Sequence, residues 1–195
     1  MVNNYETARD KYRPAAIKCL LIAESPPDIN SERFFYFEKY FSRGDSLFME
    51  TMKALFPDNA LTGGDYKRRK EEYLTKFMNA GLYLEDASSI PFPKGSSKPF
   101  KRKKLQGQLP TLKEKLLTLI DHSIPIILIS DTVFEICYDS LKKEGYNILN
   151  DKVIFFPISF QPQYRSALKA NVDKAGINLS PEELNNKPDK ELQAE

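Results

Sequence analysis

Residues 17–23 read Ile-Lys-Cys-Leu-Leu-Ile-Ala, and Glu24, Ser25 and two prolines follow directly. A short aliphatic run that is closed by polar residues and Pro is typical of a strand buried on both faces. Three further runs of this kind lie at residues 82–87, 126–130 and 153–156. Because none of them alternates strictly between apolar and polar residues, we expect a four-stranded, mainly parallel sheet covered on both faces.

Helical patterns lie between these strands. Apolar side chains recur at intervals of three and four residues, which predicts helices over 45–56, 66–79, 112–120, 131–144 and 163–175. We expect Asp45 to cap the first of them and Asp131 the fourth. Helices that alternate with strands predict right-handed crossovers, and therefore an α/β fold built as a three-layer α/β/α sandwich.

The chain has 195 residues, of which 29 are Lys or Arg and 27 are Asp or Glu, so its net charge is only +2. This length suits one domain, which we place at 1–177, followed by a polar, acidic tail at 178–195 with a short helix at 180–184. The apolar runs are too short to span a membrane, and the N-terminus lacks the pattern of a signal peptide. We therefore expect a soluble, cytoplasmic protein, and a monomer.

The two cysteines and the single histidine limit the possible chemistry. Cys19 and Cys137 cannot supply the four ligands of a structural zinc site or an iron–sulfur cluster, and their apolar surroundings favour buried thiols. We expect no metal and no cofactor. His122 precedes the third strand and so belongs to the edge opposite the one where ligands bind, which argues against a Ser–His–Asp hydrolase.

Polar side chains follow the predicted strands at their carboxyl ends. Glu24 follows the first strand, Asp86 ends the second, and the segment 159–165 follows the fourth. Because these ends meet at one edge of a parallel sheet, we expect the groups to converge on one site. Glu24 can act there as a catalytic carboxylate, or it can cap a turn or pair with a basic side chain.

An aromatic run and a basic segment lie near this edge. Among the rings of residues 34–37, some are expected to face the cleft and stack on a nucleobase, although all of them can instead belong to the core. The segment 94–104 is expected to be a flexible loop that binds nucleic-acid phosphates, with a merely solvated loop as the alternative. Its cations are Lys94, Lys98, Lys101, Arg102, Lys103 and Lys104.

In this order, the motifs resemble those of the uracil-DNA glycosylase superfamily. Residues 20–27 resemble its first motif, Gly-Glu-Ala-Pro-Gly in one branch: Glu24 and Pro26 match, while Ala23 and Pro27 replace the glycines. Residues 34–37 resemble the region that supplies a base-stacking ring. Asp86 stands where the family places an Asn that reads the base edge. Residues 156–165 resemble the second motif, His-Pro-Ser-Pro followed by a basic residue, but they lack its His.

The resemblance implies a DNA glycosylase-like protein that cleaves, or recognises, a damaged or deaminated base in DNA by hydrolysis of the N-glycosidic bond. It implies catalytic roles for Glu24 and Ser159. It also implies a substrate-binding set of Ser25, Pro26, Phe34, Phe35, Tyr36, Asp86, Gln161 and Arg165.

Several readings stay open beside this one. An Asp86 carboxylate would repel O4 of uracil unless it is protonated, so we expect a base other than uracil. A non-catalytic member of the same fold that binds nucleic acid or a nucleotide is the alternative, and an enzyme on free nucleosides or nucleotides is a third possibility. The cysteine ligands of the family's iron–sulfur branch are missing, so no cluster is implied.

Overall fold

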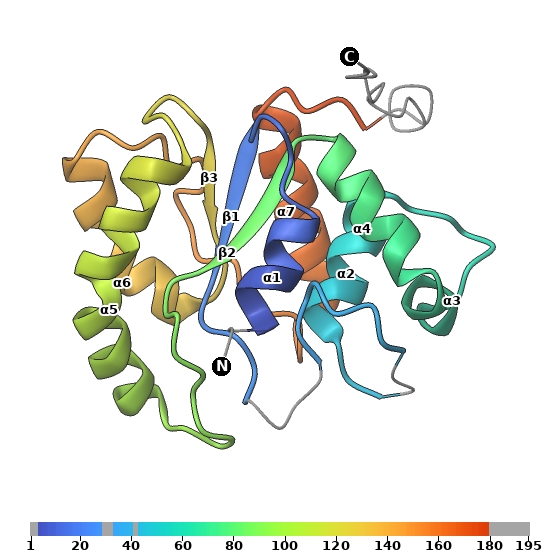
Figure 1. Ribbon diagram of the computed structural model, residues 1–195, viewed down its shortest axis with the longest axis horizontal. Coiled ribbons are helices and arrows are strands. Elements are labelled where there is room, and N and C mark those ends of the chain that lie inside the picture. Colours follow the sequence, from blue (N-terminus) through green and yellow to red (C-terminus); the bar gives the residue numbers. More distant parts are fainter. Residues whose placement is uncertain (1–3, 29–32, 41–42, 180–195) are drawn as a thin grey trace, which may run out of the picture.

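The computed structural model describes residues 4–28, 33–40 and 43–179 (Figure 1). Its sheet contains β1 (Cys19–Ala23), β2 (Leu82–Asp86) and β3 (Ile126–Leu128), all parallel, in the order β2-β1-β3. Every residue of these strands is buried. The α/β class is therefore confirmed, while the helix expected at 180–184 lies outside the described residues.

Helices lie on both sides of this sheet. Figure 1 shows α5 and α6 on one side and α1, α2, α4 and α7 on the other. The described helices are α1 (Asn4–Lys11), α2 (Ser46–Leu55), α3 (Gly63–Arg68), α4 (Lys70–Asn79), α5 (Lys98–Leu119), α6 (Asp131–Lys143) and α7 (Gln161–Lys174). None of them has the length and apolarity required to cross a membrane.

The fourth strand, expected at 153–156, does not form as a strand among the described residues. Ile154 makes a single bridge to Ile129. The Asn150 side chain takes the place of a neighbouring strand, because its amide accepts a hydrogen bond from Leu128 N at 2.9 Å and donates one to Leu128 O at 3.1 Å. One buried side chain thus satisfies both backbone groups at this edge of β3, so a full ladder is not needed there.

The basic segment is a helix rather than a flexible loop from Lys98 onward. Ser97 caps α5, because its hydroxyl accepts a hydrogen bond from the Phe100 backbone N–H. Pro99 lies in the first turn, where its missing N–H costs no hydrogen bond. The helix expected at 112–120 is the C-terminal part of this longer helix, which continues through Pro110.

Two expected helix caps differ in detail. Asp45 does precede α2, but it has a left-handed backbone with φ of 63° and makes no capping hydrogen bond. Its carboxylate instead accepts a hydrogen bond from the buried Lys70 ammonium at 2.8 Å. Asp131 is the first residue of α6, and Ser130 is the cap, because its hydroxyl accepts from Val133 N.

Both cysteines are free and buried, as expected. Cys19 lies within β1 and Cys137 lies on the inner face of α6. Burial raises the pKa of each thiol to about 12, so both stay protonated and unreactive near neutral pH. Within the described ranges, no group of three or more His, Cys, Asp or Glu side chains is placed to hold a metal ion.

Candidate functional site

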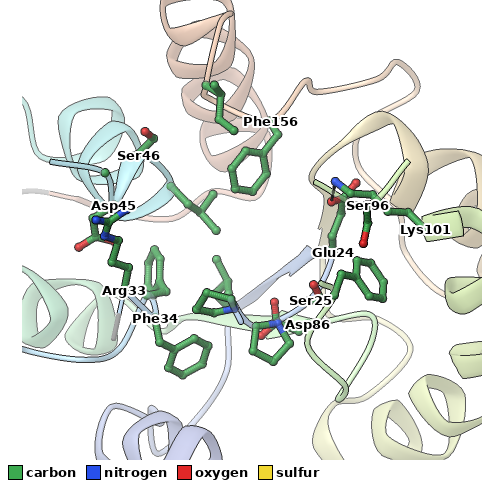
Figure 2. Close-up of a pocket in the computed structure, with 18 of the residues that line it drawn as sticks. Glu24, Ser25, Arg33, Phe34, Asp45, Ser46, Asp86, Ser96, Lys101 and Phe156 are labelled. Atoms are coloured by element: carbon green, nitrogen blue, oxygen red, sulfur yellow. Dashed lines mark hydrogen bonds and ion pairs between the residues drawn. The ribbon is translucent and has the colours of Figure 1, made fainter. Parts of the chain in front are cut away.

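A pocket of about 480 Å³ opens at the carboxyl ends of β1 and β2 (Figure 2). The two strands pair Ala23 with Asp86, so Glu24 and Asp86 lie side by side at this edge. Both residues line the pocket, as do Ser25 and Pro26 of the turn after β1. The structure thus brings together the groups expected at the ends of the first two strands.

Glu24 is held by two hydrogen bonds from the α5–α6 side of the fold. Its Oε2 accepts from Lys101 Nζ at 2.8 Å, and its Oε1 accepts from Ser130 Oγ at 3.1 Å. Ser130 has φ of 89°, a region that non-glycine residues rarely adopt. Backbone strain of this kind persists where neighbouring contacts fix it, and here it places the hydroxyl between Glu24 and the start of α6.

Asp86 belongs to a buried charge cluster beneath the pocket. Arg9 on α1 donates to Asp86 Oδ2 at 2.7 Å, and it also pairs with Glu6 at 2.6 Å and with Glu85 at 3.3 Å. Lys115 on α5 lies 2.8 Å from Glu85 and 3.3 Å from Glu6. The cluster therefore holds three carboxylates against two cations.

The protonation of Asp86 follows from this setting. Desolvation by burial raises its pKa to about 7; Arg9 opposes the rise and Glu85 adds to it. Near neutral pH, Asp86 therefore exchanges between a neutral carboxyl group and a carboxylate. Either form faces a ligand in the pocket, because Asp86 forms part of its lining.

Aromatic rings form much of the apolar wall. Phe34, Phe35, Phe92 and Phe156 all line the pocket, and the first three are buried. Tyr36 does not belong to the lining. It lies in the core, where its hydroxyl accepts a hydrogen bond from Leu84 N at 2.7 Å and lies 3.2 Å from Leu84 O. The aromatic run is thus divided between pocket and core.

A buried lysine fixes the wall that carries Phe34. Lys70 Nζ donates to the Phe34 carbonyl at 2.9 Å and to Asp45 at 2.8 Å. Lys70 is 1% exposed, so this contact joins α4, the aromatic segment and the start of α2 inside the protein. The pocket wall is consequently held by tertiary contacts rather than by regular secondary structure.

The segment 156–165, which resembles the second motif, reaches the pocket with apolar side chains only. Phe156 and Ile158 belong to the lining, whereas Ser159, Gln161 and Arg165 do not. Ser159 is exposed, and Gln161 donates to the carbonyl of Ile158 at 3.1 Å. Arg165 points toward α2, where it pairs with the buried Glu50.

The basic residues of the 94–104 segment have different surroundings. Lys101 enters the pocket, while Lys98 and Arg102 both pair with Glu135 on α6. Lys98 also pairs with Asp131. These contacts satisfy cations that were expected to bind phosphates. Lys94, Lys103 and Lys104 are exposed, and the Lys104 ammonium lies 5.6 Å from the Phe100 ring centroid.

The sequence did not predict three features of the site: the buried Arg9, the buried Lys70, and the pairing of Lys101 with Glu24. Arg9 lies on α1, a helix whose polar sequence gives little apolar periodicity. Its burial depends on acids more than seventy positions away, so no local pattern predicts it. For the pocket wall formed by Phe156 and Ile158, the sequence did offer a sign, because two apolar residues at spacing two in an extended segment face the same side.

His122 lies away from this site, as expected. Its ring packs on Tyr146 with centroids 4.2 Å apart, and it is not part of the pocket lining.

No family model matches the chain, and neither a curated protein nor a solved structure matches it. The resemblance to the uracil-DNA glycosylase superfamily therefore rests on the sequence motifs.

Proposed function

We propose that this pocket binds a nucleobase and that the protein is a DNA glycosylase-like hydrolase of N-glycosidic bonds. The observation that carries the proposal is the position of the Glu24 carboxylate in a pocket walled by Phe34, Phe35, Phe92 and Phe156. The pocket volume of about 480 Å³ lies within the range of small-molecule sites. The same proposal includes the three-layer α/β/α sandwich that the alternation of helices and strands predicts.

Glu24 supplies the chemistry in this account. Lys101 and Ser130 each occupy one carboxylate oxygen, and each oxygen keeps a second lone pair that can accept a hydrogen bond from water. The carboxylate orients a water toward the sugar carbon and stabilises the positive charge that develops there. The water oxygen bonds to that carbon, its proton passes to Glu24, and the electron pair of the broken C–N bond leaves with the base.

The direct test is an abasic-site assay. Purified protein is incubated with duplexes and single strands that each carry one altered base, and alkali then cleaves the chain wherever the base has been lost. The bases are uracil, hypoxanthine, xanthine, an oxidised purine and N-methylated adenine and cytosine. We expect cleavage with at least one of them, and none with Glu24→Gln. Absence of cleavage with every base, from folded protein, would refute the catalytic proposal.

A second candidate function is binding without cleavage, and the Lys101–Glu24 ion pair favours it. The ammonium 2.8 Å from this carboxylate offsets the negative charge that would otherwise stabilise positive charge on the sugar. This candidate predicts salt-sensitive binding to oligonucleotides that survives Glu24→Gln. Loss of binding when Lys94, Lys103 and Lys104 are neutralised, without any base release, would support it over the hydrolase.

A further inference from the structure

The charge cluster beneath the pocket places one buried carboxylate where a ligand can reach it. Glu6, Glu85 and Asp86 pair with Arg9 and Lys115 at the distances given above, Arg13 lies close enough to Glu85 to interact with its charge, and Glu6 is 38% exposed. An added cation beside the Asp86 carboxylate would stabilise its charged form against the cost of burial. Asp86 is the member of the cluster that also lines the pocket, and a ligand can therefore supply that cation.

The other carboxylates of the lining already have cations of their own. Lys101 pairs with Glu24, and Lys70 pairs with Asp45. Figure 2 shows Arg33 beside Asp45, on the side of the pocket away from Asp86. Glu24 and Asp45 thus each have a cation in the lining itself, Lys101 and Arg33, whereas Arg9, the partner of Asp86, lies outside the lining.

The aromatic walls favour the same kind of ligand. Phenyl rings present a negative face, and a cation above such a face is attracted to it more strongly where water is excluded. Phe34, a ring of the lining, is 2% exposed and already has the Arg9 guanidinium 5.2 Å from its centroid. A flat, delocalised cation can therefore stack on rings and approach the Asp86 carboxylate at once.

The chemistry of the leaving base also favours a cationic ligand. A neutral base departs as an anion and needs a hydrogen-bond donor, but Ser159, Gln161 and Arg165, the side-chain donors expected of the second motif, lie outside the lining. A base that carries a positive charge takes up the electron pair of the broken C–N bond and departs neutral. It needs no donor, while Glu24 still serves the sugar and the water.

We propose that the base accepted by this pocket is a cationic, N-alkylated nucleobase, and that Asp86 recognises its charge. This inference rests on the proposed function and names its substrate class.

The test compares the binding of matched nucleosides by calorimetry at pH 7.5. The cationic probes are 1-methyladenosine and 3-methylcytidine, and the neutral ones are adenosine and cytidine. We expect wild type to prefer each methylated nucleoside by at least about tenfold, the size of one charge-assisted contact. Asp86→Asn should lose this preference. Asp173→Asn, a change to an exposed acid on α7, should keep it.

A pH series provides a second measurement that needs no variant. As Asp86 takes up a proton below about pH 7, the preference for the cationic nucleoside should fall. The groups that face Asp86 are Tyr5 and Arg9 on α1, Glu85 on β2 and Lys115 on α5, and Glu6 pairs with both of these cations. A preference that does not change between pH 5.5 and 8 would overturn the role of Asp86, even if Asp86→Asn does not fold.

The outcomes separate the two proposals. Equal affinity for charged and neutral nucleosides, or a preference that survives Asp86→Asn, would overturn the cationic substrate class. Base release from an oligonucleotide with an uncharged lesion would then leave the hydrolase standing. No binding of any of the four nucleosides, together with no base release, would overturn both.

Discussion

Lys101 on α5 places its ammonium 2.8 Å from the carboxylate of Glu24, at the end of β1. The two residues are 77 positions apart, and they meet because α5 begins beside the carboxyl edge of the sheet. The contact joins the basic segment to the candidate catalytic residue. It also separates the two candidate functions, because Lys101 either orients Glu24 for catalysis or withholds it.

In the hydrolase account Lys101 is a positioning residue. Lys101→Met should lower the single-turnover rate of base release by about tenfold, because a carboxylate that loses one of its two fixed contacts is less well oriented. The thermal unfolding temperature should change little, since a partly exposed ion pair contributes at most about 1 kcal/mol. Lys113→Met, on the same helix and paired with Glu144 outside the pocket lining, is the control. A faster rate in Lys101→Met would show that Lys101 withholds Glu24 and would contradict its positioning role.

Two adjacent phenylalanines offer a matched test of the aromatic wall. Phe156 lines the pocket, whereas Phe155 is 46% exposed and lies outside the lining. Phe156→Ala should weaken nucleoside binding by roughly 5- to 150-fold, which corresponds to about 1–3 kcal/mol for one stacked base. Phe155→Ala should leave the dissociation constant nearly unchanged. Equal effects of both changes would show that the ligand does not stack on Phe156.

Arg9 is expected to be a major source of stability. Arg9→Met would leave Asp86 without its nearest cation and would remove one of the cations paired with Glu85, and breaking a buried pair in this way typically costs about 3–5 kcal/mol. Urea unfolding monitored by circular dichroism measures the change. Arg68→Met is the control, because Arg68 is 61% exposed and its ion pair is with Asp65, three positions away on α3. Similar unfolding midpoints for the two variants would contradict the role of the cluster.

The raised pKa of Asp86 predicts a pH dependence of stability. The folded protein holds the Asp86 proton up to about pH 7, whereas an unfolded Asp releases it near its ordinary pKa of 3.8. The contribution of Asp86 is therefore fully present below the unfolded pKa and is lost as pH rises through about 7. The free energy of unfolding of wild type minus that of Asp86→Asn should fall between pH 4 and 8. A constant difference would contradict the raised pKa.

The sequence predicts those parts of the fold that depend on local pattern. Residues 19–23, 82–86 and 126–128 are apolar enough to define three buried strands, and the carboxyl-edge rule then brings Glu24 and Asp86 together. The expected fourth strand fails because Asn150 satisfies Leu128 through its side chain. Nothing in the sequence indicates that the side chain of a polar residue near an apolar run will form the backbone hydrogen bonds that a neighbouring strand would otherwise form.

The remaining differences arise from tertiary contacts. Arg165 ends the segment that resembles the second motif, yet its side chain pairs with the buried Glu50 on α2. Lys98 and Arg102 belong to a run of basic residues that predicts phosphate binding, yet Glu135 on α6 pairs with both. In each case the partner is more than thirty positions away, and charge counted along the sequence cannot reveal it.

The most direct test of the central claim is the rate of base release by wild type and by Glu24→Gln. The rate is measured under single-turnover conditions, with the released base quantified by mass spectrometry from the most reactive oligonucleotide of the abasic-site assay. We predict that Glu24→Gln lowers this rate by at least about 100-fold, the lower end of general acid–base catalysis, while the dissociation constant for the oligonucleotide stays within a factor of three. Equal rates for the two proteins, or no release by folded wild type from any oligonucleotide, would contradict the account.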